Sequence, residues 1–358
     1  MTRTLAVVGG GVIGLSIAWR AAQTGWQVTL FDPAPGSGAS SVAGGMLAPL
    51  SEGWPGEEAT LELGAASLAR WPEFADRIAA VTGRSVFTAK GSLSVAIDAA
   101  DAADLHTVAE WVGAQGYHLE VLSRAQVREA EPSLSRSVRL GLSAPSELAV
   151  DNRALLDAVR SAAVDAGVEI VERAVADLDE LVADQIVLAA GDRTATLWPG
   201  LPVRAVKGEI LRLRSRPGTE PPPSRVVRAR VHGRPVYLVP RGDGIVVGAT
   251  QYESGRDTQV TVAGVRDLLA DAQTLLPSIG EYELAECGAG LRPMSPDNLP
   301  LIGRLSERVV VASGHGRNGI LLVPITVDAI LALLDGTTLV EVKCADPERF
   351  NHDAGAKQ

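Results

Sequence analysis

Three glycines near the N-terminus constrain the fold more than any other feature of this sequence. Gly9, Gly11 and Gly14 follow a short apolar run, Leu5–Val8, and precede a stretch of helical character, Leu15–Thr24. In a strand–turn–helix unit the first glycine permits the tight turn, the second admits a pyrophosphate, and the third lets the helix pack closely on the strand. The spacing predicts a Rossmann unit that binds a dinucleotide. The alternative is that the glycines only pack the helix against the sheet.

An acidic residue follows at the distance that a dinucleotide site requires. Asp32 ends a second apolar run, Gln27–Phe31, which is predicted to be the next strand of the same sheet. A carboxylate at this point accepts hydrogen bonds from the adenosine ribose hydroxyls and repels a 2′-phosphate. The competing interpretation makes Asp32 the cap of a loop.

A second turn rich in small residues, Ser40–Pro49 (SSVAGGMLAP), bears on which dinucleotide is bound. The glycine pattern alone does not separate FAD from NAD. A turn of small residues after the second strand lets the backbone run close to a flat, extended ligand, and it resembles that of flavoproteins in the amino-acid oxidase superfamily. The alternative, a mobile surface loop, leaves the apolar side chains of Met46 and Leu47 without a role.

The middle of the chain has a different pattern, which predicts a second domain. Residues 205–250 contain the β-rich stretches GEILRLRS, RPVYLVPR and GIVVGAT, separated by turn formers, as in an antiparallel sheet. Other expected elements are helices at 101–112, 123–131 and 266–276, and a strand at 308–312 that leads into a last helix at 320–334.

Length and charge narrow the class of protein. A chain of 358 residues suggests about two domains, and a net charge of −10 argues against nucleic-acid binding, which needs a basic face. Cys287 and Cys344 are the only cysteines, which suits a reducing cytoplasm, although one disulfide is compatible with the sequence. No membrane segment is predicted, because the apolar run 320–334 is shorter than the ~20 residues that a spanning helix needs. The five histidines show no metal-binding spacing, and no metal is expected.

Two segments in the C-terminal quarter carry a family resemblance. GAGLRPMSPDNLPLIGR (288–304) and VVVASGHGRNGILLVP (309–324), together with GGGVIG and VYLVPRGDGIVVGAT, resemble the D-amino-acid oxidase family of FAD-dependent oxidoreductases. Within that family these segments look like those of the glycine oxidases of thiamine thiazole biosynthesis. The resemblance covers nearly the whole chain in the same order.

The resemblance implies roles for particular residues. Arg292 of GLRP would hold the substrate carboxylate, Tyr237 of YLVPR would hydrogen-bond to it, and Arg317 would lie near the carboxylate or the flavin. The FAD contacts that the glycine pattern and the resemblance imply together are Gly9, Gly11, Val12, Ile13, Gly14, Asp32, Pro33, Ala39, Ser40, Gly44, Gly45, Met46, Val175, Gly191, His315, Gly316, Arg317, Asn318, Gly319, Ile320 and Leu321.

The residue types suit this chemistry independently of the family. A planar guanidinium pairs bidentately with a carboxylate, and a phenol donates one more hydrogen bond to the same anion. Because the flavin carries the difficult step, no protein nucleophile is required. The alternatives are a solvated Arg292, an ordinary strand tyrosine at 237 and a glycine-rich loop with an exposed Arg317.

Departures from the family pattern limit what can be expected of cofactor attachment and substrate. Related sarcosine oxidases attach flavin through a cysteine in the segment that aligns with LRPMSPD, which has none here, so noncovalent FAD is expected. Glycine oxidases have a histidine just before the strand tyrosine and a methionine after VGAT. This chain has Arg234, Pro235 and Gln251 at those places, so the substrate is less firmly predicted than the reaction.

The expected fold is α/β: a Rossmann-type FAD-binding domain and a discontinuous, mostly antiparallel α+β substrate domain. The limits expected are 1–80, 141–204 and 286–346 for the FAD domain, 81–140 and 205–285 for the substrate domain, and 347–358 for a tail. The expected function is oxidative deamination of glycine, and of sarcosine or small D-amino acids, with molecular oxygen as acceptor. Rival functions are a dehydrogenase that uses another electron carrier, or a flavin-binding protein without turnover. The sequence leaves the oligomeric state open, a homo-oligomer included.

Overall fold

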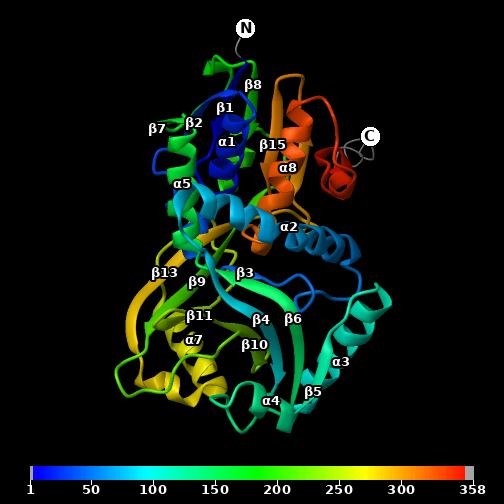
Figure 1. Cartoon of the computed structure of the whole chain (residues 1–358), viewed down its shortest axis with the longest axis vertical. Helices are drawn as coiled ribbons and strands as arrows, with labels where there is room; N and C mark the ends of the chain where they lie inside the picture. Colours follow the sequence, from blue (N-terminus) through cyan, green and yellow to red (C-terminus); the bar gives the residue numbers. More distant parts are fainter. Residues whose placement is uncertain (1–2, 351–358) are drawn as a thin grey trace.

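The computed structural model describes residues 3–350, which form two β-sheets with their helices. Figure 1 shows the first sheet, with its helices, in the upper part of the molecule and the second sheet in the lower part. Of the expected tail, residues 351–358 lie outside the described part.

The first sheet is parallel except at one edge. Its strands, in the order in which they pair, are β14 (Leu301–Arg304), β15 (Val309–Ser313), β8 (Gln185–Leu188), β1 (Thr4–Val8), β2 (Gln27–Phe31) and β7 (Glu169–Val171). Only β14 pairs antiparallel with its neighbour. Along β1, Leu5 and Val7 enter one apolar core while Ala6 and Val8 enter another, so both faces of the sheet are covered, as parallel sheets require.

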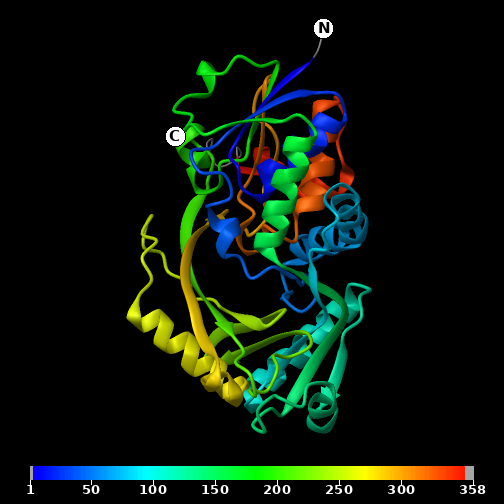
Figure 2. The ribbon, with the colours of Figure 1, turned by 60° about the vertical axis from the view of Figure 1, so that its left-hand side comes forward.

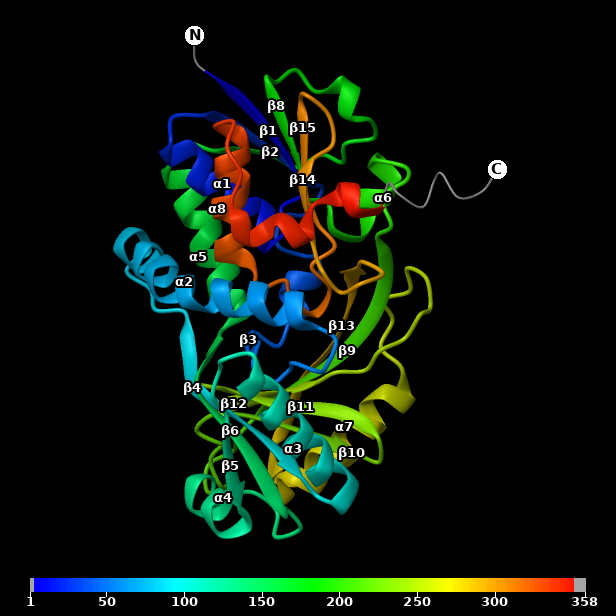
Figure 3. The same cartoon turned by 90° about the vertical axis from the view of Figure 1, so that its right-hand side faces the viewer.

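Helices cover the two faces of the first sheet unequally. One face carries α1 (Val12–Gln23), α2 (Glu58–Thr82), α5 (Asn152–Asp165) and α8 (Val323–Leu334), whose apolar side chains share one core. The opposite face carries the short α6 (Thr194–Leu197), a 3₁₀ turn (Leu178–Glu180) and segments without regular structure; Figure 3 shows α6 there. No helix within residues 3–350 has the length and apolar character needed to span a membrane.

The second sheet is mostly antiparallel. Its strands pair in the order β13 (Glu283–Met294), β9 (Arg204–Arg214), β12 (Gly244–Gly248), β11 (Arg234–Arg241), β10 (Val226–Val231), β4 (Phe87–Ala96), β6 (Leu140–Val150) and β3 (Met46–Leu47), and β5 (Glu120–Ser123) also pairs with β6. Only β10 and β4 run parallel. Figure 2 shows α7 (Val262–Leu275) on one side of this sheet, with α3 (Ala99–Ala114) and α4 (Arg124–Ala130) at its far end.

The predicted fold class is confirmed, and several element boundaries differ from expectation. Helix α1 begins at Val12, three residues before the predicted start, because Gly11 already has extended backbone and ends the turn. The last helix begins at Val323 instead of residue 320, because 316–318 form a separate 3₁₀ turn. Strands β6 and β13 belong to the second sheet although their residues 141–150 and 286–294 were assigned to the FAD domain, so the proposed domain limits pass through these strands.

Candidate active site

A large cavity lies where the two sheets meet. Its volume is about 1110 Å³, more than the ~300–1,000 Å³ typical of small-molecule sites. The first glycine turn, the second small-residue turn, the end of β13 and the 315–320 segment all line it. The cavity thus joins a dinucleotide-type loop to charged side chains of the second sheet.

The glycine turn has the tight geometry that its sequence predicts. Gly9 has φ +114°, and a Cβ there would lie 2.2 Å from the Ala189 carbonyl oxygen. A Cβ on Gly14 would lie 1.9 Å from the carbonyl oxygen of Gly9, so the helix can approach the turn only if residue 14 has no side chain. The first turn of α1 faces the cavity with no acidic side chain, leaving its positive dipole end open to an anion.

The second small-residue turn is ordered and held from three directions. The amide of buried Asn152 donates to the Ser40 carbonyl at 2.7 Å, Arg212 donates to the Ser41 carbonyl at 3.2 Å, and Arg241 donates to the Gly44 carbonyl at 2.7 Å. Burial lowers the pKa of Arg241 to about 10, which still leaves it charged at neutral pH. The backbone of this turn is therefore fixed against the cavity, which argues against a mobile surface loop.

Asp32 lines the cavity and also organises the loops around it. One carboxylate oxygen accepts from the Gly10 N–H at 2.6 Å and the other from the Ala34 N–H at 2.7 Å. A carboxylate has about four acceptor positions, so two bonds leave capacity for a ribose. The capping role and the ligand role predicted for Asp32 are thus compatible.

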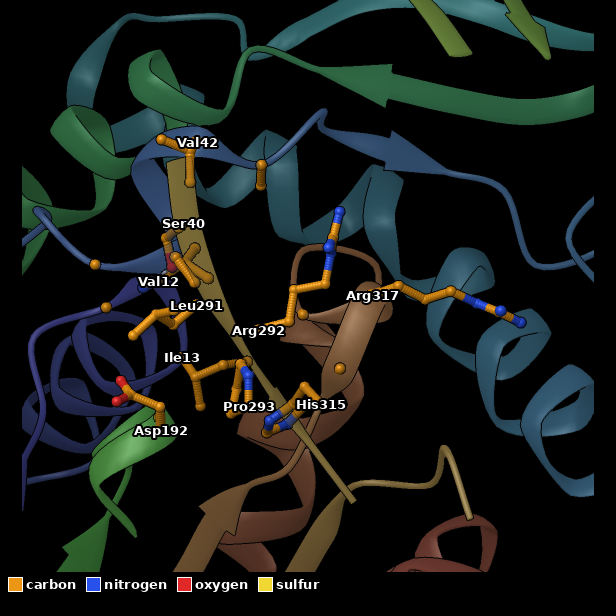
Figure 4. A pocket seen from close by; sticks show the side chains of 18 of the residues that line it. Val12, Ile13, Ser40, Val42, Asp192, Leu291, Arg292, Pro293, His315 and Arg317 are labelled. Carbon is orange, nitrogen blue, oxygen red and sulfur yellow. Dashed lines mark hydrogen bonds between the residues drawn. The ribbon is translucent and has the colours of Figure 1, made fainter. Parts of the chain in front are cut away.

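Arg292 and Tyr237 lie in the same part of the cavity wall, on β13 and β11. The Arg292 guanidinium donates to the Thr250 carbonyl at 3.2 Å and, within residues 3–350, forms no ion pair. Figure 4 shows it projecting into the cavity. Gly208 makes room for it, because a Cβ there would lie 2.2 Å from its terminal nitrogen. The cavity therefore presents an uncompensated guanidinium to any anion that enters.

Tyr237 offers a neutral hydroxyl beside that cation. Its ring lies between two glycines, since a Cβ on Gly44 or Gly248 would come within 2.9 Å or 2.2 Å of ring or hydroxyl atoms. Burial raises the pKa of Tyr237 above its usual value, and the positive charge of Arg292 opposes that rise. The phenol thus keeps its proton at neutral pH and can donate it in a hydrogen bond.

Arg317 lies in the cavity wall but is already paired. Its Nε lies 3.4 Å from Glu52 and a terminal nitrogen lies 3.1 Å from Glu57. In Figure 4 the side chain extends away from Arg292. The arrangement places Arg317 in an ion-pair network, whereas Arg292 has no acidic partner among the described residues.

His315 is buried in the wall and stays neutral. Its Nε2 lies 3.0 Å from the Thr326 hydroxyl, and burial lowers its pKa to about 3. The ring therefore contributes no positive charge to the site at working pH.

This lowered pKa predicts a pH dependence of stability. The unfolded chain takes up a proton on His315 below its ordinary pKa of ~6.5, whereas the folded chain does so only near 3. Native stability is therefore lost as pH falls from 6.5 towards 3, with about 2 kcal/mol of unfolding free energy lost between pH 7 and pH 5. Urea unfolding at both pH values should show this loss in wild type, and in His315→Gln a loss smaller by that amount. Equal losses in the two proteins would contradict a neutral buried His315.

The structure brings most of the predicted residues to one cavity. The residues that line it are Gly9, Gly11, Val12, Ile13, Asp32, Pro33, Ala39, Ser40, Gly44, Gly45, Met46, Val175, Gly191, Tyr237, Arg292, His315, Gly316, Arg317, Asn318, Gly319 and Ile320. Two others lie outside it: Gly14 packs against Gly9, and the Leu321 carbonyl accepts from Ser67 and Trp71 in the helical core.

Several charged residues of the wall were not predicted from the sequence. Glu52 and Arg228 line the cavity and form an ion pair of 3.1 Å. Both stand in segments without a recognisable motif, and only the pairing of β10 with β11 places Arg228 opposite Tyr237. The signal that the sequence offers for Arg228 is its place as a charged residue among the apolar residues of the VVRARV strand.

The cavity fits an extended dinucleotide with a flat ring system. Its wall combines an open helix N-terminus, a free acceptor capacity on Asp32 and two glycine turns in which side chains would collide with backbone or ring atoms. A mostly parallel sheet with this loop at the carboxyl ends of its strands, facing a second sheet that presents the guanidinium of Arg292, is the architecture of a dinucleotide-dependent oxidoreductase.

Comparisons with known proteins identify the family. The family described as DAO, FAD dependent oxidoreductase, matches residues 4–332, and the chain belongs to it. FAD is accordingly its cofactor, as the sequence predicts. A crystal structure of glycine oxidase from Geobacillus kaustophilus superposes with a TM-score of 0.90 at 30% identity, covering 97% of this chain and 99% of that one.

Curated relatives agree with this assignment. The bifunctional protein ThiO/ThiG of a Synechocystis species is 34% identical over 98% of this chain, which covers 54% of that protein. The putative thiamine biosynthesis oxidoreductase ThiO of Rhizobium etli is 34% identical over 89% of this chain and 93% of its own length. The chain thus spans about half the length of the bifunctional relatives and nearly all of the Rhizobium etli protein.

Proposed function

We propose that the protein oxidises glycine, and other small amino acids such as sarcosine or D-alanine, at the amine-bearing carbon. The observation that carries this proposal is the unpaired guanidinium of Arg292 beside the neutral hydroxyl of Tyr237, in the same cavity as the dinucleotide loops. A carboxylate is the anion that this pair suits best, because a planar fork and a phenol can donate to its two oxygens together.

The side chains around Arg292 and Tyr237 are suited to orienting a bound substrate, whereas the nearby His315 is not suited to general acid–base catalysis. Arg292 is confined by Gly208 on one side and anchored to the Thr250 carbonyl, so a bound carboxylate has a defined direction. His315 is buried and occupied by Thr326, so it does not serve as a base towards the substrate amine. We expect the amine to reach the site in its neutral form, with its proton lost to water.

Bound FAD would supply the chemistry by accepting two electrons, as a hydride from the substrate α-carbon. With oxygen as acceptor, glycine, O₂ and water yield glyoxylate, ammonia and H₂O₂. Names of relatives that mention thiamine support a role in supplying the glycine imine for thiazole synthesis. Both cysteines are free, which supports a reducing cytoplasm as the location.

The proposal is tested on purified holoenzyme with glycine, sarcosine and D-alanine. We expect a yellow protein that releases FAD on acid precipitation, because the LRPMSPD segment has no cysteine for attachment. Glycine should bleach the flavin absorbance without oxygen, and should yield peroxide and ammonia with it. Bleaching without peroxide would indicate a dehydrogenase, and no bleaching with any of the three would refute the proposed function.

A further inference from the structure

Glu52 lies between two of the arginines that line the cavity. It stands in the connection between β3 and α2, with its side chain only 12% exposed. One carboxylate oxygen lies 3.1 Å from Arg228 and the other lies 3.4 Å from Nε of Arg317. A single carboxylate thus contacts two cations of the wall.

The position of Glu52 is fixed by a buried carboxylate beneath it. Glu147 is fully buried and accepts from the backbone N–H groups of Leu50 and Ser51, at 2.8 Å each, and from the Ser51 hydroxyl at 2.7 Å. Arg228 closes the arrangement by donating to the Ser51 carbonyl at 2.8 Å. The Glu52–Arg228 pair is therefore built into the wall.

Among the arginines of the wall, Arg292 is the one without an acidic partner in the described part of the chain. Arg228 is paired with Glu52, and Arg317 is paired with Glu52 and Glu57. The fourth, at position 193, lies 3.8 Å from the carboxylate of its neighbour at 192. A bound anion therefore finds one free cation in this wall.

Glu52 is close enough to the Arg292–Tyr237 pair to act on a ligand bound there. Its partner Arg228 stands directly opposite Tyr237 in the pairing of β10 with β11, and the side chains of opposed residues lie on the same face of a sheet. In keeping with this, the charge of Glu52 adds to the rise in the pKa of Tyr237 and the charge of Arg292 opposes it. The negative charge of Glu52 therefore reaches the place where the proposed carboxylate binds.

We propose that Glu52 determines specificity: it neutralises Arg228 and Arg317 and so restricts the site to ligands with one anionic group. A second carboxylate on the ligand would meet the negative charge of Glu52 and no free cation. This inference rests on the proposed function, because it takes Arg292 as the binding point of the first carboxylate. It identifies the substrate class as small monocarboxylic amines and excludes acidic amino acids and amines that carry two carboxymethyl groups.

The test uses nonreactive ligands on the FAD-loaded protein, so that it does not depend on turnover. Dissociation constants of acetate, malonate, succinate and glutarate are measured from the change in flavin absorbance, in wild type and in Glu52→Gln. Wild type should prefer acetate to every dicarboxylate. In E52Q the affinity of at least one dicarboxylate relative to acetate should rise ~10-fold or more, the scale of one charge-assisted hydrogen bond that replaces one repulsion.

Two further variants control for general loss of charge and for the identity of the freed cation. Glu57→Gln removes a charge paired with Arg317 and leaves Glu52 in place. Its affinity for each dicarboxylate relative to acetate should therefore stay within about threefold of the wild-type value. The double variant Glu52→Gln, Arg228→Gln should lose the rise in dicarboxylate affinity seen in E52Q, because Arg228, the cation that E52Q frees, is absent. Should E52Q fail to yield holoenzyme, Arg228→Gln alone serves instead. This variant leaves the negative charge of Glu52 without its Arg228 partner, and it should lower the affinity for dicarboxylates relative to acetate below the wild-type value.

If the affinity for dicarboxylates relative to acetate is unchanged in E52Q, or in R228Q where that variant is used, the inference is overturned. Acetate binding to wild type would still support Arg292 as the carboxylate site. An equal rise in E57Q would show that any lost negative charge has the same effect, which also overturns the inference. If acetate does not bind to wild type at all, the proposed function and this inference both fail.

Discussion

Replacing Arg292 by Lys should lower kcat/KM for glycine by roughly 10- to 150-fold, while the FAD content stays near that of wild type. Lys keeps the charge but loses the planar fork, so one charge-assisted hydrogen bond of ~1.5–3 kcal/mol to the carboxylate is lost, at about 1.4 kcal/mol per tenfold. Arg292→Ala should lose more, because the other arginines of the wall, as far as residues 3–350 show, are already paired with carboxylates. Steady-state kinetics with glycine and with an amine that lacks a carboxylate provide the measurement.

Gly208→Ala tests the same contact without changing any charge. Its new methyl group would lie 2.2–2.5 Å from the guanidinium atoms of Arg292, which must then move. We expect kcat/KM for glycine to fall by ~10-fold or more, with little added effect in the Arg292→Ala background. Equal losses on glycine and on the carboxylate-free amine, or apoprotein from the Arg292 variants, would show that Arg292 supports the fold or the cofactor.

Gly14→Ala should yield a protein that has lost most of its FAD and unfolds at a lower temperature. The added Cβ would lie 1.9 Å from the Gly9 carbonyl oxygen, a backbone atom that cannot rotate away. Helix α1 must then shift off the glycine turn, at a cost of ~1–3 kcal/mol typical of overpacking, enough to weaken FAD binding ~10-fold or more. Flavin absorbance per chain and thermal unfolding provide the measurements.

Gly113→Ala is the matched control for this change. Gly113 lies in α3, has no unusual backbone angle and has no atom within 4 Å of the place that a Cβ would take, so the same methyl group meets open space. Its FAD content should equal that of wild type, and its stability should be equal or slightly higher, since Ala favours helix by up to ~1 kcal/mol. Similar behaviour of the two variants would contradict the packing role of Gly14.

The sequence predicted those parts of the molecule whose chemistry is local. The glycine turn is one such part, because the strand, turn and helix that it joins follow one another within residues 4–23, although the clash that excludes a side chain at Gly9 is with the distant Ala189. Helix α2 was not predicted, although it has 25 residues, because Pro72 within it and its mixed polarity hide the helical pattern. Its Pro72 marks a place where tertiary packing overrides local preference.

The candidate site likewise contains residues that sequence motifs predict and residues that only the folded structure brings together. Arg292 and Tyr237 stand in motifs, whereas Glu52 and Arg228 acquire their meaning only from strand pairing and from the buried Glu147. Such a pair is joined across 175 residues or so of chain, and no periodicity within either segment encodes it. Charge balance in the cavity is therefore a property of the folded molecule.

The order of strands in the first sheet also governs how the protein matures during synthesis. Strand β1 begins at residue 4 and β15 ends at residue 313, with β8 between them, so the sheet is complete only when nearly the whole chain has left the ribosome. The glycine turn emerges first but has neither β8 beside it nor α8 behind it for most of that time. We therefore expect capture of FAD to be a late event, and a nascent chain that stalls before β15 would carry an exposed parallel edge open to misassociation.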